Sequence, residues 1–317
     1  METFRSLHTV VVLNWHGMAD TLACVESLVA SGDVSILVVD NGSFDETLRE
    51  VEFRWPSVAT LQLDHNLGFS GGMNRGIRHA LQHGADIVTV LNNDTVVPAG
   101  AMKTLRDAAS DDLAVSPEVM YRASPEKIWF GGGTLSTDDA FPHHTPPGDL
   151  ESCDGGLRFT ELLAGCCITA KKEVWQRAGM FDERFFLYFE DSEWSIRARA
   201  RGIPLAVCCD ARILHSVSAS FRGASATLGT FYYVRNGLLF NRTIGGTIAS
   251  KIRFIRRATS GSLGGRTPRE VLRALVVVCW ATGAHIARRY GEAPAAMQTM
   301  AVRWNRQRQR APRAAER

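Results

Sequence analysis

The sequence predicts an α/β protein with a mixed, mainly parallel sheet flanked by helices. Short, almost wholly apolar runs alternate with helical stretches from residue 9 onward. Strands buried on both faces read as continuous apolar runs, and parallel strands need a crossover that is usually a helix. Acidic residues follow several of these runs, as in α/β enzymes that bind ligands at the carboxyl ends of strands. Both observations predict a ligand site at one edge of the sheet.

The first part of the chain supplies strands and helices in strict alternation. The expected strands are 9–13, 35–39, 58–63 and 86–91, and the expected helices lie near 19–30, 46–53 and 72–83. Beyond Pro98 the pattern is less regular, with a helix near 99–109, a strand near 113–119, and helices near 171–178 and 193–201. Residues 141–156 are rich in Pro, His, Asp and Gly and are expected to form a mobile loop that selects substrates.

Composition is ordinary for a globular protein, but the charge is unevenly distributed. Of the 317 residues, 45% are hydrophobic and 22% are charged. Residues 1–240 hold 20 Lys/Arg against 30 Asp/Glu, whereas residues 241–317 hold 16 against 3. A basic tail of this kind can meet anionic lipid headgroups, nucleic acid or an acidic partner, and it can equally be a solvated helical face.

The seven cysteines fit neither a zinc site nor a disulfide framework, because their number is odd and no Cys-x-x-Cys occurs. No basic-then-apolar leader opens the chain, so a reducing cytoplasm is the expected location. The longest apolar stretch, 274–284, is well short of the roughly 20 residues that span a bilayer. It is expected either to lie on the inner face of a membrane or to pack on the main domain.

The most informative segment is 91–95, where a strand ends in Leu-Asn-Asn-Asp-Thr. An Asp in this position can hold a divalent ion against a diphosphate, although Asn-Asp pairs alone are ordinary turn formers. Further acidic clusters follow apolar runs at 40–45 and 190–191, and a lone His215 follows a later apolar segment. The ordered set favours a site over a simple turn.

This order of motifs resembles the family-2 glycosyltransferases of the GT-A fold, most closely their rhamnosyltransferase-like branch. The matching segments cover roughly residues 8 to 240 and are 14–17, 40–45, 66–76, 91–95, 179–183, 190–191, His215 and 232–236. The resemblance implies a GT-A catalytic domain over 1–225, with a nucleotide-sugar half at 1–97 and an acceptor half at 98–225. A basic helical extension is then expected over 226–317.

The resemblance also implies roles for individual residues. Asp94 and His215 would bind a divalent metal, Mn²⁺ or Mg²⁺, which neutralises a diphosphate leaving group. Asp191 would be the general base that deprotonates the acceptor hydroxyl, with Glu190 orienting it or contacting the acceptor. Direct attack by the acceptor would invert the anomeric centre. Relatives commonly carry a second Asp two residues after the base, where this chain has Glu193, so the geometry at the acceptor is open.

The nucleotide side is assigned in the same way. Asp40 would contact the pyrimidine base, and the glycines of 66–76 would permit close backbone approach to the donor. The full set expected to bind the nucleotide or donor is Asn14, Trp15, His16, Asp40, Asn41, Ser43, Asp45, Asn66, Gly68, Asn74, Arg75 and Asn93. A dinucleotide fold is not indicated, because the glycine spacing is not Gly-x-Gly-x-x-Gly and follows the third strand.

Substrates and competing functions remain open from sequence. dTDP-L-rhamnose is the favoured donor and a UDP-sugar the next, while the acceptor is a glycan, a lipid-linked saccharide or a secondary metabolite. The alternatives are a non-catalytic nucleotide-sugar binding protein and a sugar-nucleotide pyrophosphorylase. Nucleic-acid binding is not supported, because the arginines at 303–313 have no recognition motif beside them. The sequence does not fix the oligomeric state.

Overall fold

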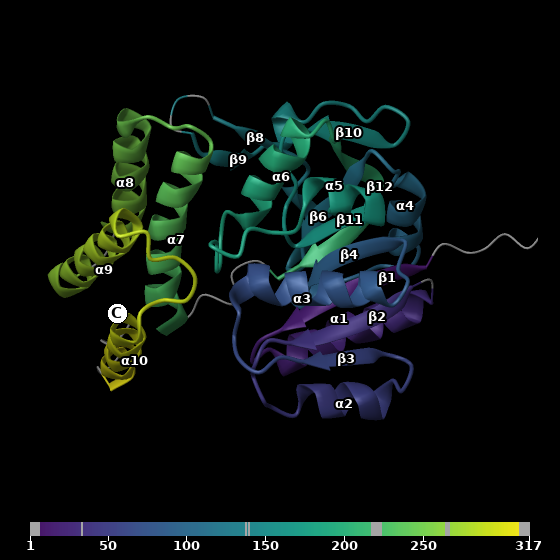
Figure 1. Cartoon of the computed structure of the whole chain (residues 1–317), viewed down its shortest axis with the longest axis horizontal. Coiled ribbons are helices and arrows are strands. Elements are labelled where there is room, and N and C mark those ends of the chain that lie inside the picture. Colours follow the sequence, from purple (N-terminus) through teal and green to yellow (C-terminus); the bar gives the residue numbers. More distant parts are fainter. Residues whose placement is uncertain are drawn as a thin grey trace, which may run out of the picture. The chain divides into compact units, whose positions relative to one another are not determined.

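A computed structural model describes residues 7–32, 34–136, 138, 140–216, 224–263 and 267–310 (Figure 1). The chain divides into two compact units. The sheet unit takes residues up to 137, then 142–183 and 190–217. The helical unit takes 138–141, 184–189 and the residues from 218 onward.

The sheet unit contains the alternating elements expected from sequence. In chain order they are β1 (His8–Asn14), α1 (Met18–Ser31), β2 (Ser35–Asp40), α2 (Thr47–Arg54), β3 (Ala59–Gln62), α3 (Gly68–Gln82), β4 (Ile87–Asn92), β5 (Thr95–Val96), α4 (Ala101–Ala108), β6 (Ala114–Tyr121), β7 (Ser124–Phe130), β8 (Gly133–Leu135), β9 (Pro142–His144), the 3₁₀ turn η1 (Pro147–Asp149), β10 (Leu157–Thr160), β11 (Cys167–Lys171), α5 (Lys172–Ala178), α6 (Glu190–Ala200) and β12 (Leu205–His215).

The main sheet is mixed and mainly parallel in its first half. Its order is β10-β12-β6-β11-β4-β1-β2-β3, with β5 paired to β12 and β7 to β6. Strands β4, β1, β2 and β3 run parallel, and β11 is inserted antiparallel between β4 and β6. The carboxyl ends of β1, β2 and β4 therefore meet at one edge of the sheet.

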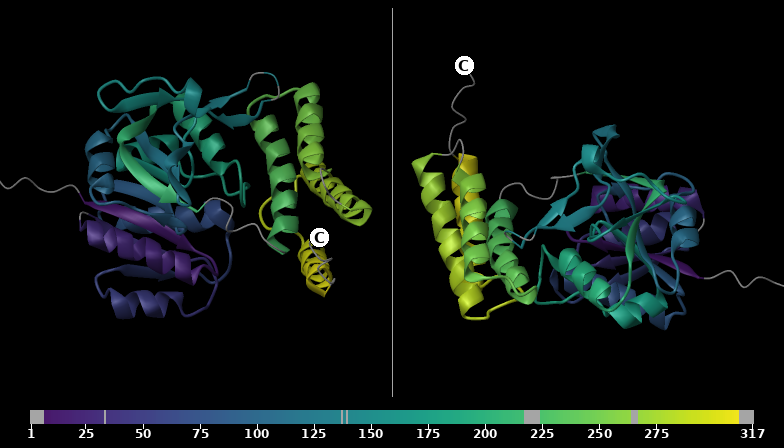
Figure 2. Two further views of the ribbon diagram at one scale, coloured as in Figure 1. Left: turned by 180° about the vertical axis from the view of Figure 1, so that it is seen from behind. Right: turned by 90° about the horizontal axis from the view of Figure 1, so that it is seen from above.

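Helices cover both faces of this sheet (Figures 1 and 2). Because side chains alternate along a strand, Val10 and Val12 of β1 pack in a core layer that includes residues of α1, α2 and α4. Val11 and Leu13 pack in the opposite layer, which includes residues of α3, α5 and α6. All seven residues of β1 are buried, which explains the continuous apolar run.

The later elements differ in part from the sequence expectation. Helix α6 begins at Glu190, three residues before the expected start, and so takes in the acidic cluster. The expected loop at 141–156 contains β9, which pairs with β8, and the turn η1. Strands β5, β10 and β11 were not expected as separate elements. Each is five residues or shorter and is defined by pairing with a distant segment.

The cysteines also depart from the expectation that no disulfide forms. The structure joins Cys153 and Cys209, 56 residues apart, in a disulfide. The backbone N of Cys209 also donates to Gly156 O, so a backbone hydrogen bond joins β12 to the segment before β10 as well. Among the described residues the other five cysteines are free thiols, of which four are buried and Cys279 is exposed.

The helical unit consists mainly of α7 (Ala224–Thr243), α8 (Ile248–Leu263), α9 (Pro268–Ile286) and α10 (Ala295–Arg310). Helix α7 packs against the other three (Figure 2). A capping box between Thr267 and Glu270 starts α9. No helix in the described part of the chain is long and apolar enough to cross a membrane. The structure does not describe four arginine side chains of the basic tail, those of Arg306, Arg308, Arg310 and Arg313.

Candidate active site

The predicted nucleotide residues gather where β1 and β2 end. Asn14 and Asp40 are partners in the β1–β2 register, and Asn14 Nδ2 donates to Asp40 Oδ1 at 2.7 Å. Asp40 Oδ2 accepts from Ser43 N at 2.9 Å, Phe44 N at 3.2 Å and Gln62 Nε2 at 2.7 Å. Burial alone would raise the pKa of this carboxyl, but these donors outweigh it and hold the pKa below its ordinary value. Asp40 is thus an ionised centre that orders the loop after β2.

The loops after β1 and β2 contact each other. His16 N donates to Ser43 Oγ at 2.9 Å, and His16 Nδ1 lies 3.8 Å from Asp45 Oδ2. His16 and Phe44 both have positive φ, at 52° and 51°. Non-glycine residues rarely adopt this conformation, and it clusters at ligand sites. Trp15 and Phe44 are 50% and 67% exposed, so each offers an aromatic face to a ligand.

Asn93 joins this region through Thr21. Asn14 Oδ1 accepts from Thr21 Oγ1 at 2.8 Å, and Asn93 Nδ2 donates to the same hydroxyl at 2.9 Å. A Cβ at Gly17 would lie 2.6 Å from Asn93 Nδ2, so a side chain at this position would displace the Asn93 amide. The structure therefore brings the ends of β1 and β4 together as the sequence predicted.

Asn41 holds the loop that precedes α3. Its Nδ2 donates to Asn66 Oδ1 and to Gly68 O, both at 3.0 Å, while its Oδ1 accepts from Leu67 N at 2.9 Å. Asn66 Oδ1 also accepts from Gly68 N at 2.8 Å. Gly68 has φ of 73°, which favours glycine at this turn. These three predicted residues act together to fix the start of α3 at the end of β2.

Asn74, Gly72 and Gly76 of the segment 66–76 contact the protein interior instead, whereas Arg75 does not. Asn74 is 2% exposed, and its amide bonds Phe181 N, Phe181 O and Glu183 Oε1. Arg75 is exposed. A Cβ at Gly72 would lie 2.6 Å from Leu13 Cδ1, and one at Gly76 would clash with Val11 Cγ1. These two glycines let α3 pack closely on β1, a role that differs from the expected approach to a donor.

The two predicted metal ligands are adjacent. β5 pairs antiparallel with the end of β12, so Thr95 stands opposite His215, and Ser216 N donates to Asp94 O at 2.9 Å. His215 Nε2 lies 3.1 Å from Asp94 Oδ1. Both residues are buried, at 7% and 8% exposure. A two-residue strand therefore unites residues that are 121 positions apart in sequence.

The donor set at this pair suits a divalent cation. Asp94 Oδ1 and His215 Nδ1 are buried and have no hydrogen-bond partner among the described residues. Buried polar atoms are normally satisfied, so these two atoms, with His215 Nε2 3.1 Å from Asp94 Oδ1, form a set of donor atoms that a bound cation would complete. Carboxylate and imidazole both bind Mn²⁺, and carboxylate binds Mg²⁺. Among the described residues no cluster of three or more His, Cys, Asp or Glu forms.

Asp191 is brought to the same region by the loop at 164–166. Asn92 N donates to Cys166 O at 2.9 Å, and Gly165 N donates to Asp191 Oδ2 at 2.9 Å. Burial raises the pKa of the Cys166 thiol well above its ordinary value, and the nearby charges of Asp94 and Asp191 add to the shift. One short loop thus connects the end of β4 to the start of α6.

Glu190 differs from Asp191 in its environment. It is 7% exposed, and its Oε2 has no hydrogen-bond partner among the described residues. Burial, followed by the charge of Asp191, raises the pKa of Glu190 well above its ordinary value. Tyr188 and Phe189, directly before it, both have φ of 71°. Strained backbone of this kind costs about 1–3 kcal/mol per residue and is concentrated at functional sites.

Glu193 forms a structural ion pair. Its carboxylate accepts from Arg197 Nε at 2.9 Å and Nη2 at 2.8 Å. Arg197 also donates to the carbonyls of Ala178 and Met180. Through Arg197, Glu193 therefore holds α6 against the turn after α5.

Sequence reasoning missed an aromatic cluster beside His215. The Trp129 ring is edge-on to His215 and to His144, with centroids 4.8 Å apart in each pair. His144 Nδ1 lies 3.1 Å from Trp129 O. Burial lowers the pKa of His144, while the Trp129 carbonyl and the charge of Asp191 act in the opposite direction. The only sequence signal was the His-rich, loop-like composition of 141–156.

The predicted motif at 232–236 lies in the helical unit. Arg235 is fully buried, and its guanidinium lies 5.2 Å from the ring centroids of Phe231 and Tyr232. Its Nη2 donates to Gly291 O at 2.6 Å, and burial lowers the pKa of Arg235 to about 10. Tyr232 Oη accepts from Ala293 N at 2.9 Å. These contacts tie α7 to the segment before α10.

Known proteins match this chain in both sequence and fold. Residues 9–144 match the family model Glycosyl transferase family 2. The chain is 29% identical over 213 residues to an N-acetylglucosaminyl-diphospho-decaprenol L-rhamnosyltransferase of Mycobacterium tuberculosis, covering 60% of this chain and 68% of that protein. It is 25% identical over 226 residues to a dTDP-rhamnosyl transferase of Shigella flexneri, covering 65% and 70%.

The fold is shared with a solved glycosyltransferase. The structure of GalNAc-T7 with UDP, GalNAc and Mn²⁺ superposes with a TM-score of 0.63 at 14% identity. The superposition covers 90% of this chain and 58% of that one. At this identity the likeness extends to the fold alone.

Proposed function

The chain is a family-2 glycosyltransferase of the GT-A fold, and from this premise we propose that it moves a sugar from a nucleotide-diphosphate donor to an acceptor hydroxyl with inversion of the anomeric centre. The observation that carries the proposal is the convergence of Asp94, His215 and Asp191. The first two are 3.1 Å apart, and the third is held by the loop that bonds the end of β4.

The donor would lie at the carboxyl ends of β1, β2 and β4. Asp40 keeps the loops at 14–17 and 43–45 ordered, and Trp15, Ser43 and Asp45 are the neighbouring groups open to a nucleoside. Asp94 and His215 would hold a divalent cation, which when bound neutralises charge on the diphosphate. Asn93 stands next to Asp94 and would contact the donor directly.

Asp191 would accept the proton of the attacking hydroxyl. Its Oδ2 is oriented by Gly165 N and its Oδ1 by Ser192 N at 2.6 Å, so the carboxylate has a fixed direction. A base must be held within hydrogen-bond reach of the proton that it removes. Glu190, whose raised pKa favours the neutral acid, would donate a hydrogen bond in the acceptor region.

The relatives favour a rhamnosyl donor. Two of them carry rhamnosyltransferase in their names, one with dTDP-rhamnose and one with a decaprenol-linked acceptor. We therefore infer dTDP-L-rhamnose as the donor and a lipid-linked saccharide as the acceptor. A UDP-sugar donor and a glycan or secondary-metabolite acceptor are the next choices.

A lipid-linked acceptor requires the enzyme to work at a membrane surface. Residues 241–317 carry 16 Lys/Arg against 3 acidic residues, so the proposed contact with the inner face of the membrane lies within this region. The contact that we propose is peripheral.

Donor turnover in the native enzyme and in Asp191→Asn tests this function. The native enzyme should release dTDP or UDP only when donor, acceptor and metal are all present. Asp191→Asn should reduce transfer at least 100-fold, within the range for loss of a general base, while binding the nucleotide diphosphate as well as the native enzyme. Near-native turnover of Asp191→Asn would show that another group is the base.

A further inference from the structure

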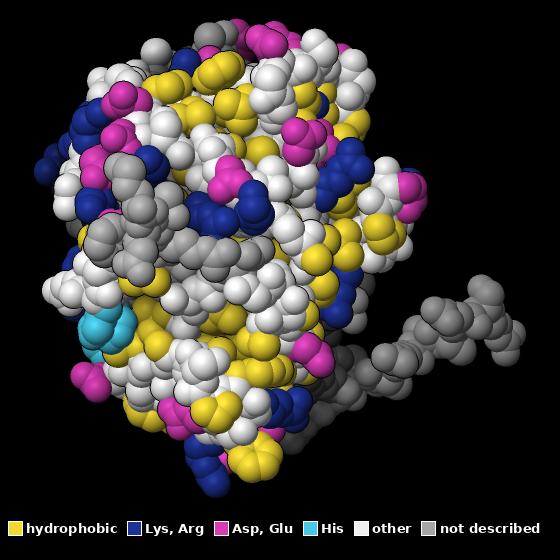
Figure 3. Space-filling view, turned by 90° about the vertical axis from the view of Figure 1, so that its right-hand side faces the viewer, with side chains coloured by type: hydrophobic (Ala, Val, Ile, Leu, Met, Phe, Trp, Pro, Cys, Tyr) yellow, Lys and Arg dark blue, Asp and Glu magenta, His cyan; other side chains and the backbone are white. Residues whose placement is uncertain are grey.

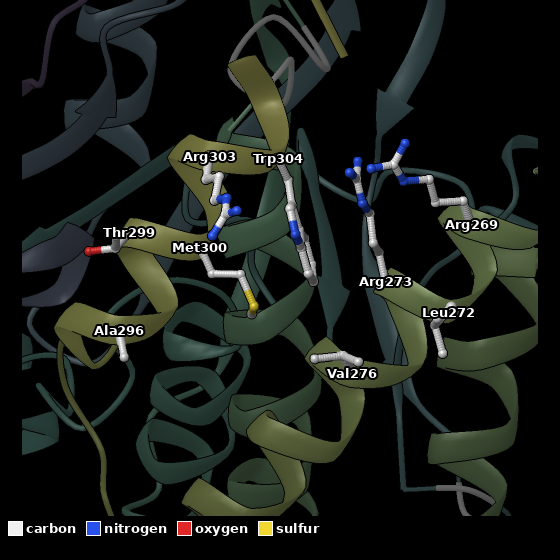
Figure 4. A pocket seen from close by; sticks show the side chains of 9 residues that line it. All are labelled: Arg269, Leu272, Arg273, Val276, Ala296, Thr299, Met300, Arg303 and Trp304. Carbon is white, nitrogen blue, oxygen red and sulfur yellow. The ribbon is translucent and has the colours of Figure 1, made fainter. Parts of the chain in front are cut away.

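The facing sides of α9 and α10 form an open groove of about 660 Å³. Its lining residues recur at three- and four-residue intervals, so each helix contributes one face. They are Arg269, Leu272, Arg273, Val276, Ala296, Thr299, Met300, Arg303 and Trp304 (Figure 4). Here this cavity is called the α9–α10 groove. It lies wholly within the helical unit, and none of the catalytic assignments uses it.

The groove combines three arginines with an apolar floor. The Arg273 guanidinium lies 5.1 Å from the ring centroid of Trp304, and Figure 4 shows the side chains of Arg269 and Arg273 extending from the same helix. None of the nine lining residues is acidic. A ligand that fits this lining is an anion with an apolar portion.

Helix α9 is apolar on two faces, and one of them is exposed. Ala274, Val277, Val278 and Ala281 are at most 9% exposed and face the other helices of the unit. On the outer side, Leu272 is 63% exposed, Leu275 43%, Trp280 41% and Ile286 75%. Exposed apolar side chains that are grouped on one side of a helix mark an interaction site. Leu272 belongs to both the groove and this outer stripe, so the two surfaces are continuous.

From these contacts we propose that the α9–α10 groove binds the phosphate headgroup of an anionic phospholipid while the outer stripe of α9 enters the bilayer interface. An anionic bilayer offers a phosphate layer for the arginines directly above an apolar layer for Leu272, Leu275, Trp280 and Ile286. A second copy of this chain fits less well. A two-fold contact through the same face would oppose arginine to arginine. The inference rests on the proposed membrane contact, and it does not depend on the sugar transfer.

The face displayed in Figure 3 is different in character. There, acidic and basic side chains are interspersed among apolar ones. Mixed charge does not attract an anionic surface. A control variant must also lose one positive charge, so that the effect of the groove can be separated from the effect of net charge. The control therefore replaces an arginine of the helical unit that lies outside the groove.

Vesicle flotation of the full-length protein tests the proposal. The native protein should float with phosphatidylcholine vesicles that contain phosphatidylglycerol and should not float with pure phosphatidylcholine. Arg303→Gln should weaken partitioning about fivefold, which corresponds to the ~1 kcal/mol of one basic residue near an anionic surface. Leu272→Gln should weaken it severalfold as well. Arg256→Gln, an exposed arginine of α8 with the same change of charge, should alter partitioning less than twofold.

Three outcomes would overturn the proposal. Equal losses for Arg303→Gln and Arg256→Gln would mean that binding reflects net charge and not the groove. Failure of the native protein to float with either vesicle would reject the membrane contact itself, while turnover with a soluble acceptor would still test the transferase function separately. A lipid-free dimer that Leu272→Gln dissociates would assign the stripe to a subunit interface. Far-UV circular dichroism establishes that each variant is folded.

Discussion

Replacing Asp40 by Asn should loosen the nucleotide region without changing its shape. The Asp40 carboxylate accepts four hydrogen bonds, from Asn14 Nδ2, Ser43 N, Phe44 N and Gln62 Nε2, and it is 1% exposed. Every partner is a donor, so both oxygens must accept. An Asn side chain has only one oxygen, and its amide nitrogen would face at least one of these donors.

The better orientation of the new amide loses one bond and weakens three. If the oxygen of the new amide replaces Oδ2, its nitrogen faces Asn14 Nδ2, which is also a donor. Asn14 cannot offer its oxygen instead, because Asn14 Oδ1 already accepts from Gly17 N and Thr21 Oγ1. A hydrogen bond to a charged group contributes about 1.5–3 kcal/mol and a neutral one about 0.5–1.5 kcal/mol. Removing a buried charge recovers part of this loss. The expected decrease in the free energy of unfolding is about 2–3 kcal/mol.

Urea denaturation at neutral pH measures this change. Asp45→Asn is the matched control, because Asp45 is exposed and its Oδ1 accepts from Thr47 N, a hydrogen bond that an amide oxygen can also accept. The control should remain within about 0.5 kcal/mol of the native protein. Nucleotide-diphosphate affinity should fall for Asp40→Asn more than for the control.

The pH dependence has a definite sign. The pKa of Asp40 is lower in the folded protein than its ordinary value of about 3.9, so its stabilising contribution is present above that pH. It is lost as pH falls through the folded pKa. The difference between native and Asp40→Asn should therefore narrow in acid. A difference below about 0.5 kcal/mol at pH 7, or one that does not depend on pH, would refute this account of the network.

Three further predictions concern other parts of the chain. The contribution of Glu190 to stability is full below its ordinary pKa of about 4.3 and is lost as pH rises toward its higher pKa in the folded protein. Glu190→Gln should therefore gain thermal stability over the native protein as pH rises to neutral. The absence of such a gain would contradict the burial of Glu190 as a neutral acid. Gly76→Ala should lower the free energy of unfolding in urea by about 1–3 kcal/mol, because the new Cβ meets Val11 and lies 3.0 Å from Val39 Cγ2. Gly283→Ala, whose Cβ has no atom within 4 Å, should raise the free energy of unfolding by up to about 1 kcal/mol. Equal effects of the two variants would contradict the packing argument. Asp94→Ala should weaken metal-dependent diphosphate binding in calorimetry about tenfold or more, and unchanged affinity would remove Asp94 from the metal site.

Much of the fold follows from hydrophobic patterning. The strands at β1, β2, β3 and β4 were predicted within two residues at each end, because strands in the middle of a sheet are continuous apolar runs. Strand β11 was not predicted. Its sequence, Cys-Ile-Thr-Ala-Lys, is short and unremarkable, and its position between β4 and β6 depends on pairing with β4 residues that lie 76–84 positions earlier. Local sequence carries no signal for such pairing.

The site was predictable where residues follow a strand directly. Asn14, Asp40 and Asp94 lie at or just beyond strand ends, and the parallel register alone places their strands side by side. Trp129 and His144 could not be found this way. They reach His215 only because β7 pairs with β6 and β9 lies beyond it in a separate hairpin. Gly72 and Gly76 were expected to let the backbone approach the donor. Composition cannot distinguish a glycine that contacts a ligand from one that packs against a strand.

The most direct test of the central claim is calorimetric binding of dTDP, UDP, GDP and ADP to the native protein, with Mn²⁺ or Mg²⁺ and again with chelator. The account predicts metal-dependent binding of a pyrimidine diphosphate that chelator abolishes and that His215→Ala weakens. Binding that is equally tight with chelator, or that is unchanged in His215→Ala, would contradict a metal-assisted site at Asp94 and His215.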